Sequence, residues 1–241
     1  LALNWWSGNT NLYHWLRDVF ARAYVLTQLG DGPITILCAK DPRPFQRHGL
    51  DALLRRFPNC QLHELDLSEK VRVENLVQPC MNPYVRGNGY LRREVADFIR
   101  DIYLDGIMAG EETAVTYISR AEVGSRRLLD EPEMIERVSA VLPLRVTRIE
   151  QLPFHEQLSL MAATNTLIGI YGAGLIHVLF TKREGLVEIH NGDSRETHFS
   201  TLSAGLGVPY SVVQGGPAKQ NQDFALGTLG IDELLSRLEG M

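Results

Sequence analysis

A glycine turn stands at the end of one apolar run in this chain. Residues 167–170 are mostly branched and apolar, Gly172-Ala173-Gly174 follows after one tyrosine, and a helical pattern begins at once. In a parallel sheet this places backbone N–H groups of a helix N-terminus at the carboxyl edge, where they attract anions. Glycine also lets a ligand approach the backbone, because no Cβ intervenes. The segment therefore predicts a phosphate site, although a plain strand–helix connection fits the same residues.

Arginines and carboxylates gather after an earlier predicted strand. Arg120 ends that strand, and the loop that follows carries Arg126, Arg127, Asp130 and Glu131. Guanidinium groups can neutralise a diphosphate leaving group without a metal, through paired hydrogen bonds. The alternative is a solvated charged loop in which Asp130 caps the next helix and Glu131 stabilises its first turn.

One histidine is placed for proton transfer. His14 falls in the first turn of a predicted helix, and Asp18, four residues on, lies on the same face. A carboxylate in that position can hold the imidazole tautomer, which leaves the other nitrogen to act as a base. Asn11 either caps the helix or contacts an acceptor. The competing interpretation is a packed histidine among its aromatic neighbours, Tyr13 and Trp15.

The elements that must position these groups alternate along the whole chain. Short β-branched runs are separated by amphipathic stretches, which predicts right-handed βαβ units and parallel sheets. Strands are predicted at 2–6, 34–39, 61–65, 71–77, 114–119, 144–149, 166–171, 186–189 and 210–213, and helices at 11–28, 44–56, 91–108, 131–142, 154–163, 173–180 and 231–238.

The pattern restarts after Ala109-Gly110-Glu111-Glu112, so we expect two α/β domains, residues 1–109 and 110–241. A chain of 241 residues suits one large domain or two domains of about 120 residues. The run 214–222, rich in glycine and glutamine, predicts an exposed loop, and His190 is expected on a surface loop as well. Trp5 and Trp6 are candidates for stacking on a sugar.

Composition excludes several classes of protein. The formal charge of −5 lacks the positive excess typical of nucleic-acid binders. No apolar run approaches the roughly 20 residues of a transmembrane helix. Three cysteines without a C-x-x-C pair argue against a zinc site and a disulfide framework. With no N-x-S/T sequon present, these features favour a reducing, cytoplasmic compartment, with a lumenal one as the alternative.

Four motifs occur in an order that resembles glycosyltransferase family 61. They are Tyr-Ile-Ser-Arg120 with Arg126-Arg-Leu-Leu-Asp-Glu131, Leu-Pro-Phe-His-Glu-Gln157, Ile-Gly-Ile-Tyr171-Gly-Ala-Gly-Leu-Ile-His-Val-Leu-Phe180, and Val-Glu188-Ile. The family shares Arg-Arg-x-x-Asn-Glu, Phe-x-Glu-Gln, His-Gly-Ala-Gly-Leu and Glu-Ile elements. The start Asn11-Leu-Tyr-His-Trp-Leu16 also resembles that of the family's N-terminal half. The resemblance spans nearly the whole chain and is densest between residues 117 and 190.

This resemblance implies a GT-B architecture, with two Rossmann-like parallel-sheet halves facing a cleft and the nucleotide sugar on the C-terminal half. It implies an inverting, metal-independent transfer of a hexose or pentose from a nucleoside diphosphate, expected to be UDP, to a carbohydrate or glycan hydroxyl. No cofactor is expected, and the chain contains no Asp-x-Asp pair for a metal. The expected setting is the assembly of surface polysaccharides.

Transfer of the family's roles, residue by residue, assigns the donor to the C-terminal half. Arg120 and Arg127 are predicted to hold the diphosphate together with the amides of Gly172, Ala173 and Gly174, and Glu131 belongs to the same donor-side element. Glu188 is expected to accept from the ribose. Gln157 is expected to order the donor or the loop beneath it, and a plain place on the helix surface is the alternative.

Two positions depart from the family pattern. Tyr171 replaces its histidine, and a phenol can hydrogen-bond a phosphate but does not titrate near neutrality. Asp130 replaces its asparagine. An inverting displacement needs a base opposite the leaving group, so His14 on the N-terminal half is the predicted base, with Asp18 orienting it and Asn11 near the acceptor.

Two other functions remain open at this stage. One is a catalytically silent sugar-nucleotide or glycan-binding domain, which Tyr171 suggests. The other, a NAD-dependent oxidoreductase, is disfavoured because the glycine turn lacks the third glycine of that fingerprint.

Overall fold

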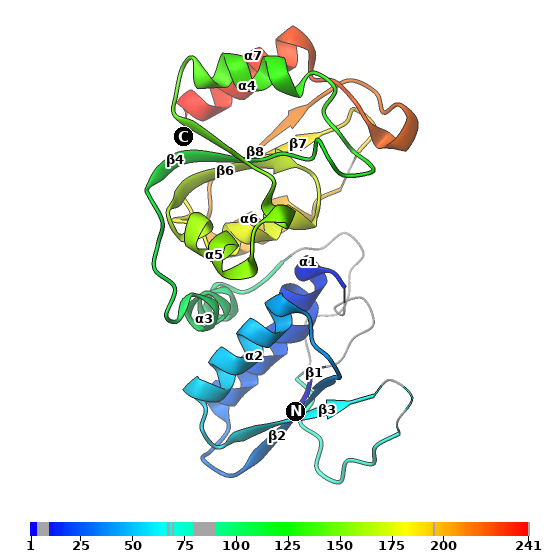
Figure 1. Ribbon diagram of the computed structural model, residues 1–241, viewed down its shortest axis with the longest axis vertical. Coiled ribbons are helices and arrows are strands. Elements are labelled where there is room, and N and C mark those ends of the chain that lie inside the picture. Colours follow the sequence, from blue (N-terminus) through cyan, green and yellow to red (C-terminus); the bar gives the residue numbers. More distant parts are fainter. Residues whose placement is uncertain (4–9, 67, 69, 80–89, 195, 241) are drawn as a thin grey trace. The chain divides into compact units, whose positions relative to one another are not determined.

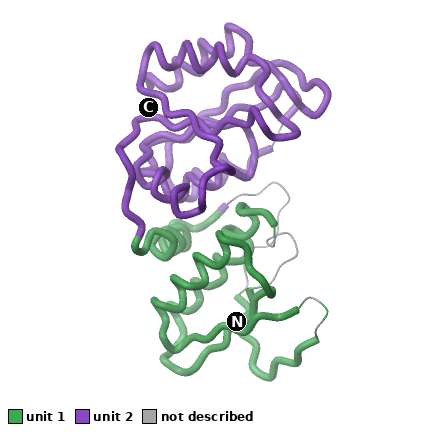
Figure 2. The backbone as a smooth tube through the Cα atoms, viewed as in Figure 1, with its two compact units in different colours: residues 1–86, 91–106 green, residues 87–90, 107–241 purple. Residues whose placement is uncertain are grey.

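The chain divides into two compact units in a computed structural model that describes all residues except 4–9, 67, 69, 80–89, 195 and 241 (Figures 1 and 2). Unit 1 comprises Leu1–Arg86 and Leu91–Gly106, and unit 2 comprises Gly87–Tyr90 and Ile107–Met241. Trp5 and Trp6, the predicted stacking residues, lie outside the described residues. Each unit is described below by itself.

Unit 1 is built on a parallel sheet with the order β1-β2-β3. Its strands are β1 (Ala2–Leu3), β2 (Ile34–Ala39) and β3 (Cys60–Leu65). Its helical segments are α1 (Leu12–His14), a π-helical turn (Trp15–Val19), a 3-10 segment (Phe20–Gln28), α2 (Pro44–Arg56) and α3 (Arg93–Leu104). The predicted helix over 11–28 is thus one helical stretch whose hydrogen-bond pattern changes twice.

The core of unit 1 fixes the start of that stretch. Trp15 donates its indole N–H to the hydroxyl of Tyr103 on α3 (2.7 Å), which in turn donates to the carbonyl oxygen of Phe45 on α2 (3.1 Å). Gly49 leaves room for this hydroxyl, because a Cβ there would lie 2.3 Å from it. The residue next to His14 is therefore tied to both long helices of the unit.

Unit 2 holds a five-stranded parallel sheet with the order β5-β4-β6-β7-β8. The strands are β4 (Thr113–Ile118), β5 (Leu144–Thr147), β6 (Thr164–Ile170), β7 (Gly185–His190) and β8 (Tyr210–Gln214). The helices are α4 (Glu131–Ser139), α5 (Phe154–Ala162), α6 (His198–Leu206) and α7 (Gly227–Glu239), with 3-10 segments at Ile149–Gln151, Ala173–Leu179 (η5) and Gln220–Gln222. In Figure 1, α4 and α7 cover one face and α5 and α6 the other.

Burial follows from this layering. The residues of β6 and β7 are almost all buried, as expected for central strands covered on both faces. Counted within the unit, the strand order is 2-1-3-4-5, a doubly wound arrangement in which the winding direction reverses between β4 and β6. Ligands of such folds bind in the crevice outside the carboxyl ends of the two strands at that reversal.

Two predictions about elements are wrong. Residues 71–77 form no strand, and Val71, Val73 and Leu76 are exposed, because no neighbouring strand covers them. The helix α6 was not predicted, since its Ser, Thr and Gly residues are typical of loops; it ends at Gly207, which takes the left-handed conformation (φ 68°). No helix among the described residues has the length and apolar character to cross a membrane.

Candidate active site

The carboxyl ends of β4 and β6 bring Arg120 against the glycine turn. A Cβ on Gly172 would lie 2.9 Å from Nη1 of Arg120, so glycine at this position makes room for the guanidinium. The Nη2 group of Arg120 also donates to the carbonyl oxygen of Ser125 (3.1 Å). Arg120 and Gly172, predicted from separate motifs, are neighbours at the reversal point of the sheet.

Arg126 reaches the same turn. Its Nη1 donates to the carbonyl oxygen of Tyr171 (2.8 Å), and its Cζ lies 5.4 Å from the centre of the Tyr171 ring. The backbone of Arg126 is left-handed (φ 57°). The sequence predicts Arg126 in the cationic loop but assigns the diphosphate to Arg120 and Arg127.

Arg120 and Arg126 are two cations close to one another. Burial lowers the pKa of Arg120, the nearby positive charge of Arg126 lowers it further, and the negative charge of Glu150 partly opposes this change. Among the residues that the structure describes, neither guanidinium forms an ion pair with a carboxylate. Two cations beside a backbone turn, without a direct ion pair, create a positive potential that suits an anionic ligand.

Arg127 has a different partner. Its Nε and Nη2 donate to Oδ2 of Asp223 (2.9 and 2.6 Å), and its backbone N–H donates to Oδ1 (2.8 Å). These hydrogen bonds hold the pKa of Asp223 below its usual range. An isolated parallel β-bridge between Leu128 and Phe224 joins the same two loops. Arg127 thereby fastens two loops together, and its predicted contact with a diphosphate stays a prediction.

The acidic residues of this loop also have internal partners. Asp130 occupies the N-cap position of α4, as one alternative expected, but its side chain makes no capping hydrogen bond there and accepts instead from the backbone N–H groups of Leu226 (3.0 Å) and Gly227 (2.7 Å) at the start of α7. Glu131 is buried and accepts from the hydroxyls of Tyr117 (2.7 Å) and Ser119 (3.0 Å) on the preceding strand. Its assignment to the donor site stays untested.

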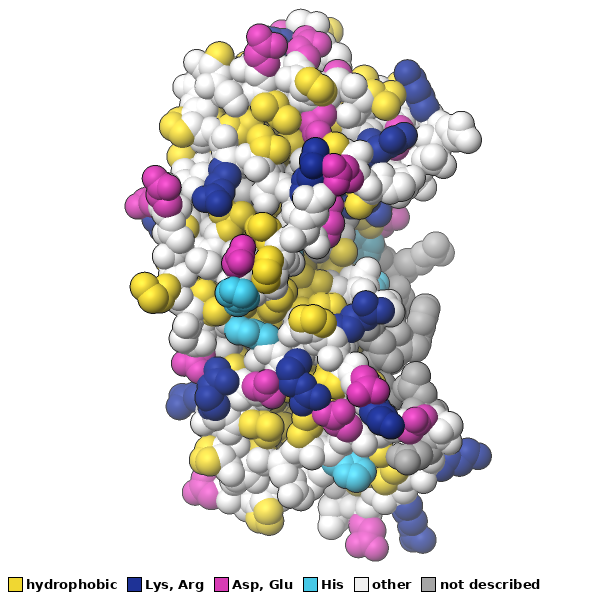
Figure 3. All heavy atoms as spheres, in the orientation of Figure 1, with side chains coloured by type: hydrophobic (Ala, Val, Ile, Leu, Met, Phe, Trp, Pro, Cys, Tyr) yellow, Lys and Arg dark blue, Asp and Glu magenta, His cyan; other side chains and the backbone are white. Residues whose placement is uncertain are grey.

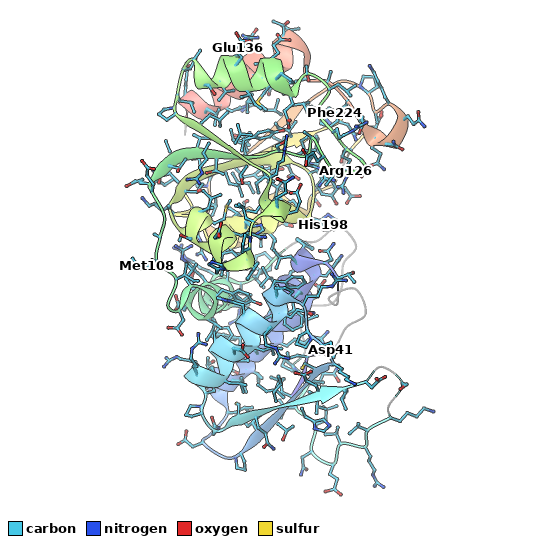
Figure 4. All side chains as sticks on the ribbon, in the orientation of Figure 1. Asp41, Met108, Arg126, Glu136, His198 and Phe224 are labelled. Atoms are coloured by element: carbon cyan, nitrogen blue, oxygen red, sulfur yellow. The ribbon has the colours of Figure 1, made fainter. Side chains whose placement is uncertain are left out.

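Tyr171 lies among three aromatic side chains from two elements, His190 on β7 and His198 and Phe199 on α6. Its hydroxyl is 3.1 Å from Nδ1 of His198 on α6, and its ring centre is 5.2 Å from that of His190. Burial raises the pKa of Tyr171 to about 12, so the phenol is neutral near pH 7. Figure 4 shows Arg126 and His198 on the same side of unit 2. His198 was missed, since it belongs to the helix that the sequence did not predict.

Glu188 is fully buried in the middle of the sheet. Its Oε2 accepts from the hydroxyl of Tyr210 (2.6 Å). Its Oε1 lies 3.0 Å from Nε2 of His190, but neither atom has a hydrogen-bond partner among the residues that the structure describes. The predicted contact of Glu188 with a ribose stays a prediction. His190 is the last residue of β7 and is buried, so its placement on a surface loop is wrong.

Gln157 contacts the glycine turn through a histidine. Its Nε2 donates to the carbonyl oxygen of Leu152 (2.9 Å), and its Oε1 lies 3.0 Å from Nε2 of His177. The other ring nitrogen of His177 lies 2.8 Å from the carbonyl oxygen of Gly174. This geometry favours the second of the two roles expected for Gln157, ordering of the loop.

In unit 1, the predicted pair of His14 and Asp18 is in contact. Nδ1 of His14 lies 2.7 Å from Oδ2 of Asp18, whose Oδ1 accepts from Arg17 (2.5 Å). Asn11 accepts from the backbone N–H of His14 (3.3 Å) and so caps the helix. The His14 side chain is 34% exposed. The π-helical turn Trp15–Val19 begins at the next residue, and such turns are frequent at functional sites. The catalytic role of the pair stays a prediction.

The surface shown in Figure 3 carries basic and acidic side chains interspersed on each unit, as expected from the charge balance. The described residues contain no cluster of three His, Cys, Asp or Glu side chains that could hold a metal ion. Cys38 and Cys60 are free thiols, while Cys80 lies outside the described residues.

Comparison with known proteins places this arrangement in a family. The model of the family described as Glycosyltransferase 61 matches residues 12–187, about three quarters of the chain. The chain belongs to glycosyltransferase family 61. The matched range includes His14, Arg120, Arg126 and the turn Tyr171–Gly174, and it ends one residue before Glu188.

The chain is also similar to the EGF domain-specific O-linked N-acetylglucosamine transferase of Drosophila melanogaster. It is 39% identical to this chain over 72 residues, which are 29% of this chain and 14% of the relative. The alignment thus spans a small part of the relative's length.

Proposed function

We propose that this member of glycosyltransferase family 61 is an inverting, metal-independent enzyme that transfers a sugar from a UDP-linked donor to a carbohydrate hydroxyl. The observation that carries the proposal is the pair of guanidinium groups, Arg120 and Arg126, beside the glycine turn at the sheet's reversal point. The GT-B arrangement, with two halves facing a cleft, belongs to the same proposal.

The donor site lies in unit 2. Arg120 and Arg126 hold the diphosphate and stabilise the negative charge that develops as the bond between the anomeric carbon and the phosphate oxygen breaks. The backbone N–H groups of Ala173 and Gly174 add donors, because the first N–H groups of a helical turn have no partner within it. The neutral phenol of Tyr171 contributes a hydroxyl at the same place.

The base is His14. With Nδ1–H donated to Asp18, the lone pair of Nε2 accepts the proton of the acceptor hydroxyl while that oxygen bonds to the anomeric carbon. The proton ends on His14 and the electron pair of the broken bond on the leaving UDP. Asp18 stabilises the imidazolium that forms.

Calorimetric titration with UDP, UMP and uridine tests the donor site. We expect the β-phosphate to add most of the affinity, and Arg126→Ala to remove that increment. Arg127→Ala is the matched control, because the neighbouring guanidinium is engaged by Asp223. Equal affinity of UDP and UMP for the unmodified chain would contradict the placement of the diphosphate. NAD in the same titration tests the oxidoreductase alternative.

A second function is favoured by Tyr171, which stands where the family has a histidine. In that case the chain binds a sugar nucleotide or glycan without turnover. UDP-N-acetylglucosamine is the donor to test first, since the Drosophila relative is named for that sugar. Release of UDP, with or without an acceptor, supports the enzyme; tight donor binding with no release across a panel of UDP-sugars and acceptor glycans supports the silent domain.

A further inference from the structure

A chain of polar contacts lies beneath the glycine turn. His177 on η5 is 2% exposed, and its two ring nitrogens face the carbonyl oxygen of Gly174 and the amide of Gln157. The other end of that amide faces the carbonyl oxygen of Leu152. Three contacts thus run in series from the turn to the segment that precedes α5.

A neutral His177 supplies too few N–H groups for the acceptors along this series. If the amide oxygen of Gln157 faces His177, the amide N–H of Gln157 donates to the carbonyl oxygen of Leu152. Both ring nitrogens of His177 then face acceptors, whereas a neutral imidazole has one N–H to donate. If the amide is turned over, the imidazole is satisfied and two oxygens face each other at Leu152. In either orientation a neutral His177 leaves one contact of this series without a proton, either at the buried imidazole or at the part-buried amide.

The imidazolium form completes the series. With a proton on each ring nitrogen, His177 donates to Gly174 and to Gln157, and Gln157 donates to Leu152. Burial opposes this form and lowers the pKa of His177 to about 4, so the empty protein is neutral and one contact short near pH 7.

Neighbouring side-chain charges do not account for this state. The titratable groups on the elements packed against η5 are His155 and Glu156 on α5 and His198 on α6. The pKa of His177 depends on its burial and on the carbonyl of Gly174, with no contribution from these groups. A new charge at the turn would therefore act on a ring whose protonation is set by burial and by the carbonyl of Gly174.

We propose that Gln157 and His177 are positioning residues of the glycine turn, and that His177 takes up a proton when a nucleoside diphosphate binds there. This inference rests on the proposed function. The anion on the turn amides attracts a positive charge at the ring that holds the carbonyl of Gly174, and protonation supplies the missing hydrogen bond. Donor binding and ordering of the turn are then linked, and UDP binds more tightly as the pH falls toward 6.

The test is titration calorimetry with UDP at pH 7 in two buffers that differ in ionisation enthalpy, which counts the protons taken up per UDP. The variant His177→Asn keeps an amide nitrogen near the position of Nδ1 but cannot titrate. We expect the unmodified chain to take up more protons than the variant, by up to about half a proton per UDP, because an opposite charge raises a pKa by about 1–3 units. The difference cancels any change in the ionisation of UDP itself. His155→Asn, on the exposed side of α5, is the matched control and should match the unmodified chain.

A second variant separates this role from a purely structural one. In Gln157→Glu a carboxylate faces Nε2 of His177, so the ring should be protonated before UDP arrives and the uptake should disappear. Nitrogen NMR of the unmodified chain follows the ring directly, because the two signals of a neutral imidazole are far apart and converge on protonation.

The outcomes divide as follows. If UDP binds with the same proton uptake in the unmodified chain and in His177→Asn, the inference fails and the donor site stands. If UDP does not bind the unmodified chain, the proposed function fails and the inference with it. If neither variant folds, the NMR signals of His177 with and without UDP decide, and signals that stay apart in the complex overturn the inference.

Discussion

The first helical turn of unit 1 and the glycine turn of unit 2 each depend on one histidine bound to a neighbouring side chain. His14 lies 2.7 Å from a carboxylate oxygen of Asp18 and is one third exposed, whereas His177 lies 3.0 Å from the amide oxygen of Gln157 and is almost fully buried. The carboxylate stabilises an imidazolium, and solvent can reach the ring. The amide carries no charge, and burial keeps the second ring neutral.

The difference shows how burial and partner together decide what an imidazole does. His14 can exchange its proton with a substrate hydroxyl, which is the requirement for a general base. His177 cannot reach a substrate and acts on the backbone of the turn instead. Four experiments test the roles of these two histidines and of the arginines beside the glycine turn.

Replacing His14 should have the largest effect. We expect His14→Ala to lower turnover by about 10²- to 10⁴-fold, the usual contribution of a positioned base, and to leave the UDP affinity unchanged. Turnover is measured as UDP release, and affinity by calorimetry. His63→Ala, on the exposed face of β3, is the control. Full activity of His14→Ala would remove this residue from the mechanism.

The buried histidine should reveal itself in the pH dependence of stability. An unfolded chain binds a proton at His177 below about pH 6.5, while the folded chain does so only near pH 4, so the stabilisation present above pH 6.5 is lost as the pH falls to 4. The loss amounts to about 3 kcal/mol of unfolding free energy. Urea unfolding at several pH values measures it, and the decline should be smaller in His177→Asn. Parallel curves for the two proteins would refute the assignment.

Adjacent arginines provide the next comparison. Arg126→Ala should weaken UDP binding by about 10- to 100-fold, because a charge-assisted hydrogen bond is lost. Arg127→Ala should leave the affinity nearly unchanged but lower the thermal midpoint by a few degrees, since Asp223 loses its partner. Calorimetry and thermal unfolding of both variants decide, and the opposite pattern would restore the diphosphate to Arg127.

The smallest effect is expected at Asp18. Asp18→Asn keeps the shape of the side chain but removes the charge that stabilises an imidazolium at His14. Turnover, measured as UDP release, should fall by about tenfold, because the imidazolium that forms during the transfer loses the charge that stabilises it. Unchanged turnover would show that His14 acts without Asp18.

Much of the fold could be predicted, since strands buried on both faces and amphipathic helices leave clear periodic patterns. The strand β2 and the helix α2 have the predicted limits, Ile34–Ala39 and Pro44–Arg56. Residues 71–77 show why periodicity alone is insufficient, because valines at strand spacing need a neighbouring strand to pair with. The helix α6 was not predicted, because its small polar residues are typical of loops.

The sequence predicted which segments carry the site residues but not which of these residues contact one another in unit 2. Motif spacing identified the cationic loop and the glycine turn, which the strand order brings together. It could not rank Arg126 against Arg127, because the choice depends on Asp223, 96 positions away. The contact of His14 with Asp18 was predictable, since it spans one helical turn.

Gly49 has a consequence for any survey of variants. Any larger side chain there would push into the hydroxyl of Tyr103 and disturb the indole of Trp15 bound to it, one peptide bond from His14. A substitution in the middle of α2 would then impair proton transfer without touching a reacting group. In a survey of variants, substitutions of Gly49 would therefore lower activity as substitutions of site residues do, although Gly49 lies 35 positions along the chain from His14.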